Sequence, residues 1–293
     1  MTDLHVVGVH GVRQRDTNAI KLADDWNQAL ARGIAVHAGS HAVVPVVTAP
    51  YYGDVFRRGR LKLGEDEVSD FATTDEEELA YILGALEVHS PPVPGQQLSA
   101  GTLGMPPRMN PRLVRAIARV DRRCGNGAGR LVFSRISEMY GYFKDKDKAE
   151  QIRTRVREAV EQTGTPLIIA HSLGSVVVYD MFQRGQIPAP AAGTGVTQLI
   201  TCGSPLAWMP VQRKLGLTAT AGLRLPMGVA WLNVYDPRDP VTAGVGLVAL
   251  APELIDAPVD NRNDPHAADR YLEQKAVALG VQAALEVSAP PEL

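Results

Sequence analysis

The chain has 293 residues, with 30 basic and 32 acidic side chains and a formal net charge of −2. This length is near the upper end of what one α/β domain holds, so we expect a single domain, residues 1–293, with an insertion. The charge is balanced and no dense cluster of Lys and Arg occurs, which excludes the basic stripe that tracks phosphates and predicts no nucleic-acid partner.

Targeting and redox signals are sparse. The N-terminus, "MTDLHVVGVHGV", is acidic where a signal peptide is basic, and no apolar stretch approaches the roughly 18 residues that span a bilayer. The two cysteines, Cys124 and Cys202, lie in unrelated contexts, which excludes a disulfide scaffold or zinc site and favours a reducing compartment. We therefore expect a cytoplasmic protein without a cleaved leader, a transmembrane segment, a metal or an organic cofactor.

The first elements predicted are a buried strand and an amphipathic helix. Residues 4–9, "LHVVGV", are β-branched and apolar and end at a His-Gly turn. Asp16 or Thr17 then caps a helix that runs to about residue 32. The apolar positions of this helix are Ile20, Leu22, Ala23, Trp26 and Leu30.

A second strand and a long interruption follow. Residues 42–53 are apolar, and Pro45 within them favours an edge or irregular strand. Residues 54–150 carry charged helical stretches and a Pro/Gly-rich passage without a buried strand, so we predict an inserted helical cap or lid there. A charged helix ending near Gln162 leads out of it.

Strands and helices then alternate again, which predicts an α/β fold with a mostly parallel sheet covered by helices on both faces. The predicted elements are strand 166–170, helix 174–184, strand 196–201, a short helix near 209–215, strand 229–235 and a helix from about 267 to 285.

The stretch "AHSLG", residues 170–174, lies in the turn between strand 166–170 and helix 174–184. The G-x-S-x-G nucleophile elbow needs small residues two positions before and after its serine, because strand and helix approach closely there. Ala170 and Gly174 meet this need around Ser172. The alternative is that Ser172 only caps the helix.

With this motif and the initial "HG" turn, the chain resembles the α/β-hydrolase superfamily, in particular its lipase- and esterase-like serine hydrolases. The resemblance covers residues 4–53 and 165 to about 275, and leaves out the middle insertion. It implies a Ser-His-Asp triad whose members follow one another in the chain order Ser, acid, His.

That order leaves one histidine. Six of the seven precede Ser172, namely His5, His10, His37, His41, His89 and His171, and His266 alone follows it. His266 lies in a polar, Pro-containing loop before the last helix, where the superfamily places its base. The alternative is a solvated surface histidine.

The acid is expected after strand 229–235, in "DPRDPVTAG", which offers Asp236 and Asp239. The "D-P-V" that begins at Asp239 resembles the acid turn of the superfamily, so Asp239 is favoured over Asp236. Asp180 lies too far along the helix after Ser172. The three later residues Asp256, Asp260 and Asp264 are interpreted as loop residues.

An oxyanion hole needs two backbone N–H groups. Leu173 follows the nucleophile and supplies one. The resemblance assigns the second to Val12, with Gly11 permitting the bend and His10 structural. A dinucleotide loop is the alternative for "GVHG", but the G-x-G-x-x-G spacing is missing.

Apolar residues of the insertion either line an acyl pocket or form the core of the cap, and the second is favoured. They are Leu103, Met105, Met109, Tyr140, Tyr142 and Phe143. Tyr51 and Tyr52, at the end of the second strand, either gate the site or pack beneath the cap.

These features predict an acyl hydrolase that cleaves a carboxylic ester or thioester of a small-molecule or lipid acyl substrate. Ser172 attacks, His266 transfers the proton and Asp239 orients the imidazole. An acyltransferase with the same triad, and a binding or regulatory protein that retains the fold without turnover, are the alternatives.

Overall fold

Six parallel strands form one sheet in the described part of the chain, in the order β2-β1-β3-β4-β5-β6. The computed structural model describes residues 4–12, 14, 17–39, 41–56, 75–89, 110–125, 127–188, 190, 195–218 and 221–288. The strands are β1 (His5–Val9), β2 (Val46–Thr48), β3 (Leu167–His171), β4 (Gln198–Cys202), β5 (Ala230–Tyr235) and β6 (Ile255–Pro258).

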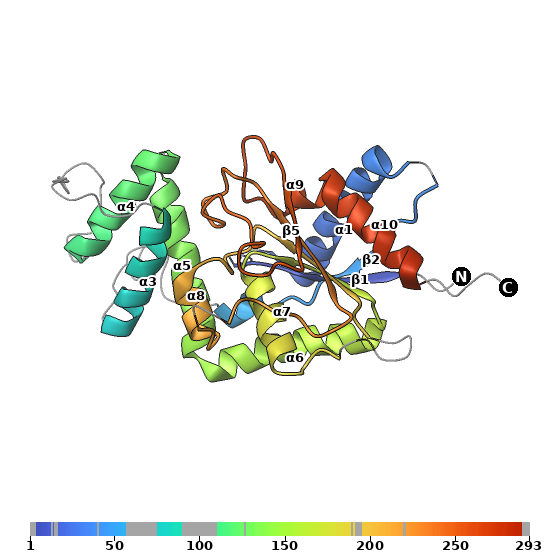
Figure 1. Ribbon diagram of the computed structural model, residues 1–293, viewed down its shortest axis with the longest axis horizontal. Helices are drawn as coiled ribbons and strands as arrows, with labels where there is room; N and C mark the ends of the chain where they lie inside the picture. The colour runs from blue at the N-terminus through green and yellow to red at the C-terminus, as the bar shows by residue number, and fades with distance from the viewer. Residues whose placement is uncertain are drawn as a thin grey trace.

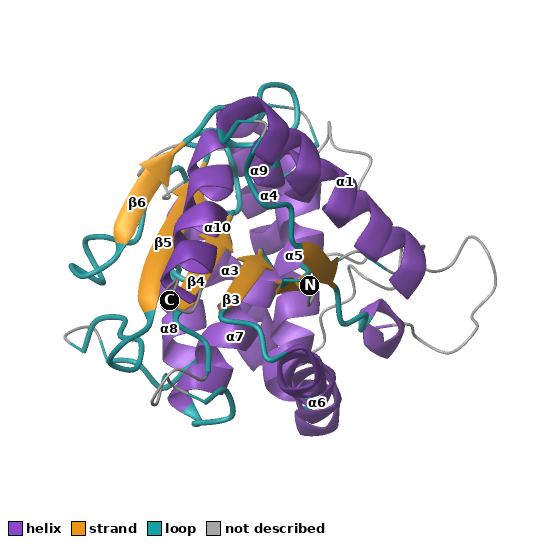
Figure 2. Ribbon diagram, turned by 90° about the vertical axis from the view of Figure 1, so that its right-hand side faces the viewer, coloured by secondary structure: helices purple, strands orange, loops and turns teal. Residues whose placement is uncertain are grey.

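Helices cover both faces of this sheet, as the α/β prediction requires (Figures 1 and 2). Helices α1, α9 and α10 pack on one face, and α6 and α7 on the other. The helical segments are α1 (Ala19–His37), η1 (Gly53–Phe56), α3 (Glu76–His89), α4 (Pro111–Cys124), α5 (Ala128–Lys144), α6 (Lys146–Thr163), α7 (Leu173–Gln183), α8 (Met209–Lys214), α9 (Ala268–Leu272) and α10 (Lys275–Ser288).

The strand side chains divide the core in two, because successive residues of a strand point to opposite faces. In β3, Leu167 and Ile169 belong to the core beneath α1, α9 and α10, whereas Ile168 and Ala170 belong to the core beneath α6 and α7. Every residue of β3 is buried. A strand that is covered on both faces is continuously apolar, which is why "LIIA" is recognisable in the sequence.

The direction in which the chain builds the sheet reverses at its centre. From β1 the chain adds β2 on one side, and from β3 onward it adds β4, β5 and β6 on the other. Parallel α/β sheets form a crevice at the carboxyl ends of the two strands where this reversal occurs. Here these strands are β1 and β3, so the turns that begin at His10 and Ser172 lie side by side.

The predicted strands are confirmed, and β2 is an edge strand as Pro45 indicated. β6 was not predicted. Asp256 lies in β6 and not in a loop, and this interpretation was wrong. Its carboxylate accepts hydrogen bonds from Asn233 Nδ2 at 2.7 Å and Leu247 N at 3.0 Å, which hold the other edge of the sheet.

Two helix predictions need correction. Asn18, and not Asp16 or Thr17, caps α1, since its Oδ1 accepts from Lys21 N at 2.9 Å. Ile20, expected among the apolar positions, is 76% exposed. The predicted C-terminal helix is two helices, α9 and α10.

The region between β2 and β3 is helical in its described residues. Figure 1 shows α3, α4 and α5 gathered beside the sheet, on the side where β1 ends. α6 begins inside the range expected for the insertion but packs against β1 and α7, so it belongs to the sheet's own covering layer. Leu103, Met105 and Met109 lie outside the described residues. None of the described helices is long and apolar enough to cross a membrane.

Candidate active site

Ser172 occupies a strained turn between β3 and α7. Its backbone has φ 54° and ψ −123°, a conformation that non-glycine residues rarely adopt and that costs on the order of 1–3 kcal/mol. Ser172 N donates to Cys202 O at 3.0 Å, which fixes the turn to β4. The side chain of Ser172 makes no capping hydrogen bond to α7, so the interpretation of Ser172 as a helix cap is wrong.

The small residues around Ser172 allow the close approach of α7 to β1. A Cβ on Gly174 would lie 2.2 Å from Val9 O and 2.8 Å from His10 O, which no side chain tolerates. Ala170 is fully buried in β3 and its methyl group fits the core. Ala170 and Gly174 therefore meet the steric need for which they were selected in the sequence.

A continuous chain of hydrogen bonds joins Ser172, His266 and Asp239. His266 Nε2 lies 3.1 Å from Ser172 Oγ, and His266 Nδ1 lies 2.7 Å from Asp239 Oδ2. A carboxylate only accepts, so Nδ1 carries the proton and Nε2 accepts from the serine hydroxyl. All three side chains are buried. His266 is thus not the solvated surface histidine of the alternative interpretation.

Asp239 is the carboxylate beside His266, and Asp236 is not. Asp239 also accepts from Val241 N at 2.7 Å and from the Tyr271 hydroxyl at 2.8 Å. Asp236 instead accepts from Asn261 N at 2.6 Å and pairs with Arg238. The sequence preference for Asp239 therefore agrees with the geometry, while Asp236 holds the loops around it.

Burial shifts the pKa values of His266 and Asp239. Desolvation by burial, and then the charge of Arg135 on α5, lower the pKa of His266 well below its ordinary value. Burial raises the pKa of Asp239, while its hydrogen bonds from Val241 N and Tyr271 act in the opposite direction by favouring the carboxylate. His266 is consequently a neutral imidazole at neutral pH, which is the form that accepts a proton.

The turn after β1 lies against Ser172. A Cβ on Gly11 would lie 2.7 Å from Ser172 Cβ and 3.2 Å from its Oγ, so glycine permits this approach. Leu173 is the first residue of α7, where helix geometry leaves the N–H without an acceptor inside the helix. The amides of Val12 and Leu173 therefore belong to the two segments that meet at Ser172, and their role as oxyanion donors stays a prediction.

His10 is held as a neutral imidazole by the backbone, which agrees with its structural interpretation. Its Nδ1 donates to Gly11 O at 2.7 Å, its Nε2 accepts from Tyr52 N at 3.1 Å, and its ring stacks on Tyr52 at 3.7 Å between centroids. Burial lowers the pKa of His10 to about 4, although the hydrogen bond to Gly11 O and the charge of Asp54 act in the opposite direction. Protonation would place an N–H of His10 against the N–H of Tyr52.

We expect His10 to make stability dependent on pH. Its pKa is about 4 in the folded protein, against 6.5 when exposed. The stabilisation of the folded protein by neutral His10 is therefore complete above pH 6.5 and is lost as the pH falls toward 4, because the unfolded chain binds the proton first. The loss amounts to about 3 kcal/mol. Urea unfolding at pH 7.5, 5.5 and 4.5 measures it, with His10→Gln as the matched variant. Equal pH dependence of the two proteins would contradict this assignment.

Three residues that contact this site were not selected from the sequence. Gly203 follows β4 with φ 57°, and a Cβ there would lie 2.9 Å from Asp239 Oδ2 and 3.2 Å from His266 Nδ1. Tyr271 and His171 contact Asp239 and His266 from α9 and β3. Gly203 could have been predicted, because "CGS" ends a buried strand at the same sheet edge. Nothing in the local sequence of Tyr271 indicates that it contacts the site.

The tyrosines that the sequence left open are packing residues. Tyr52 is fully buried and stacks on His10, and the Tyr51 hydroxyl donates to Gln14 O at 2.8 Å. Tyr140 and Tyr142 are buried in the core that runs from α3, α4 and α5 to the α6–α7 face of the sheet, with Phe143 packed against it. The Tyr142 hydroxyl donates to Asp180 Oδ2 of α7 at 2.7 Å. These contacts favour a core role for the aromatic residues of α5 over an acyl pocket.

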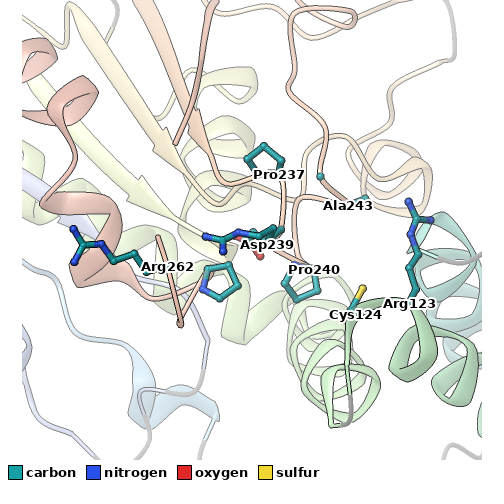
Figure 3. A pocket seen from close by; sticks show the side chains of 10 residues that line it. Arg123, Cys124, Pro237, Asp239, Pro240, Ala243 and Arg262 are labelled. Atoms are coloured by element: carbon teal, nitrogen blue, oxygen red, sulfur yellow. The ribbon is translucent and has the colours of Figure 1, made fainter. Parts of the chain in front are cut away.

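A cleft of about 380 Å³ lies beside Asp239 (Figure 3). Figure 3 shows Pro237 and Pro240, in the loop after β5, on one side and Cys124, the last residue of α4, on the other. Ser172 itself has no exposed surface. A substrate therefore reaches Ser172 only when residues that cover it move.

Comparisons with protein-family models, with curated proteins and with solved structures found no match for this chain. Within the described residues no group of three or more His, Cys, Asp and Glu side chains is arranged to hold a metal ion. The geometry of the site therefore has to indicate its chemistry.

Proposed function

We propose that this protein is a serine hydrolase of the α/β-hydrolase type that cleaves a carboxylic ester or thioester through an acyl-enzyme. The observation that carries the proposal is the hydrogen-bonded chain Ser172–His266–Asp239, at 3.1 and 2.7 Å, on a strained serine at the central crevice of the sheet. A backbone strained at a single serine with a base in contact is typical of an activated nucleophile.

The reaction then proceeds in two halves. Ser172 Oγ bonds to the acyl carbon while its proton passes to His266 Nε2, and the carbonyl oxygen takes the negative charge toward the amides of Val12 and Leu173. When the carbonyl reforms, the bond to the alcohol or thiol breaks and that group leaves with the proton from His266. Water repeats the sequence on the acyl-enzyme, releases the acid and restores Ser172.

The arrangement of the sheet supports the α/β-hydrolase type. The nucleophile follows the central strand β3, the acid follows β5 and the base precedes α9, in the chain order Ser, Asp, His. In this proposal α3, α4 and α5 are the cap, because they come between β2 and β3 and the end of α4 borders the cleft beside Asp239. The complete hydrogen-bonded chain favours turnover over a binding role.

A covalent probe tests the proposal. A small fluorophosphonate exchanges its P–F bond for a P–O bond to an activated serine, so intact mass should show one adduct on the wild type after prolonged incubation, and none on Ser172→Ala. Ser204→Ala is the matched control, since Ser204 is also buried and its Oγ accepts from Ser175 Oγ at 2.7 Å. Folded wild type that stays unlabelled and inactive on acyl esters would refute the proposal.

A further inference from the structure

His171, which directly precedes Ser172, is a buried histidine that the proposed mechanism does not use. It is the last residue of β3, and the alternation along the strand places it on the face of Leu167 and Ile169. That face is covered by α9, which follows the loop of His266. His171 therefore lies on the face of the sheet that α9 covers, against the loop of His266.

The contacts of His171 join two parts of the site. Its Nε2 lies 2.9 Å from the carbonyl oxygen of His266, and because a carbonyl only accepts, this nitrogen carries the proton. Its ring centroid lies 4.7 Å from that of His266 and 5.9 Å from that of Tyr271. On the other side, a Cβ on Gly11 would lie 3.3 Å from His171 Nδ1. The imidazole of His171 thus lies between the loop that carries His266 and the turn after β1.

Most anchors of the loop that carries His266 lie at its start, where Gln274 Nε2 donates to Asn261 Oδ1 at 2.9 Å and Arg262 N donates to Asp260 Oδ1 at 2.7 Å. Asn261 N donates to Asp236 at 2.6 Å and Asn261 Nδ2 donates to Pro265 O at 3.0 Å, while the loop's own backbone bonds, Asp264 N to Asn261 O and Ala267 N to Asp264 O, are 3.4 and 3.2 Å long. Pro265 has no N–H to contribute. Among the hydrogen bonds of the described residues, that from His171 is the one made to the main chain of His266 itself.

We propose that His171 is a positioning residue, whose Nε2–H fixes the carbonyl of His266 and thereby holds the imidazole of His266 within 3.1 Å of Ser172 Oγ. The inference rests on the proposed function, because it assigns His171 to the base of that reaction. His171 does not touch the reacting atoms. Its side chain acts only through the main chain and the ring of His266.

Loss of this donor has a specific consequence. The carbonyl of His266 would be buried without a partner, which the loop relieves by shifting toward other donors or water. A displacement of the base by about 1 Å is enough to lower a rate about 100-fold, since proton transfer needs the near-attack geometry. We therefore expect the chemical step to slow while substrate binding changes little.

The pair His171→Gln and His171→Asn tests the proposal. The amide nitrogen of Gln reaches about as far as Nε2 of His, whereas that of Asn is one bond shorter, so both variants are polar and uncharged but only Gln can donate to His266 O. The measurements are kcat and KM for a p-nitrophenyl ester and the rate of fluorophosphonate labelling, together with thermal unfolding. Wild type and Ser172→Ala are measured in parallel.

We expect His171→Gln to keep kcat and the labelling rate within about threefold of wild type, and His171→Asn to lose about 10- to 100-fold in both, with KM within about threefold. Equal rates for the two variants, whether both normal or both slow, would overturn the positioning role, as would a loss confined to KM. Unlabelled wild type would instead refute the proposed function. If His171→Asn fails to fold, the proposal is tested by comparing His171→Gln with wild type. A His171→Gln protein that is folded but slow would contradict it, because the amide N–H of Gln should replace the bond to His266 O.

Discussion

Replacement of His266 by alanine is expected to lower kcat for ester hydrolysis on the order of 10⁵-fold. A serine hydroxyl is a weak nucleophile near neutral pH, and His266 Nε2, at 3.1 Å from Ser172 Oγ, is the described base in contact with it. The residual activity should come from the oxyanion donors and from binding, which do not need the imidazole. Steady-state kinetics on p-nitrophenyl acetate and on longer acyl esters measures the loss.

A matched control separates loss of the base from a general effect of removing a histidine. His41 is exposed and lies before β2, so His41→Ala should keep the full rate. Circular dichroism and thermal unfolding test whether His266→Ala is folded. A folded His266→Ala protein that keeps more than about a tenth of the wild-type rate would contradict the assignment of His266 as the base.

The central strands were predictable because burial on both faces demands an unbroken apolar run. β1, β3 and β4 lie inside the sheet and read as "HVVGV", "LIIAH" and "QLITC". β6 escaped prediction, since this four-residue edge strand contains an exposed isoleucine, an aspartate and a proline. The Asp256 side chain also accepts from Asn233 of β5, a contact that no local pattern reveals.

Helix ends were less predictable than helix positions. Asp16, Thr17 and Asn18 are all good capping residues, and the choice of Asn18 depends on where α1 docks on the sheet. The division between α9 and α10 likewise has no strong breaker in "ADRYLEQKAV". Tertiary packing decides both.

The residues of the candidate site also differ in how far the sequence predicts them. Ser172, Asp239 and His266 were predictable because each lies in a turn at the carboxyl edge of a parallel sheet and the chain order left few choices. His171 and Tyr271 were not, because their importance comes from a strand face and a helix that meet only in the folded protein. Gly203 is intermediate, as its place after β4 was visible but its contact with Asp239 was not.

Asp239→Asn is expected to lower kcat about 10⁴-fold with little change in KM. An asparagine that turns its N–H toward His266 Nδ1 puts the ring proton on Nε2, which then no longer accepts from Ser172. An asparagine that turns its oxygen toward Nδ1 lacks the charge that stabilises the imidazolium, which makes Nε2 a weaker base. Val241 N donates to Oδ1 and the Tyr271 hydroxyl to Oδ2, so an asparagine, with its single acceptor oxygen, keeps one of these two bonds, and we expect the fold to be retained. Kinetics at neutral pH, with unfolding in urea, measures the two effects separately.

Asp236→Asn is the matched variant, because Asp236 is equally buried, lies three residues earlier and is the other carboxylate of the same turn. Asp236 holds Asn261 N at 2.6 Å and pairs with Arg238, so its replacement acts on the loops and not on the proton path. We expect Asp236→Asn to lower the free energy of unfolding by about 1–3 kcal/mol while kcat falls far less than in Asp239→Asn. If instead Asp236→Asn showed the larger loss in kcat, the carboxylate that acts on His266 during turnover would be Asp236, and the acid turn would have to rearrange when substrate binds. The pair therefore tests whether the hydrogen bond of 2.7 Å between His266 and Asp239 is the one used in the reaction.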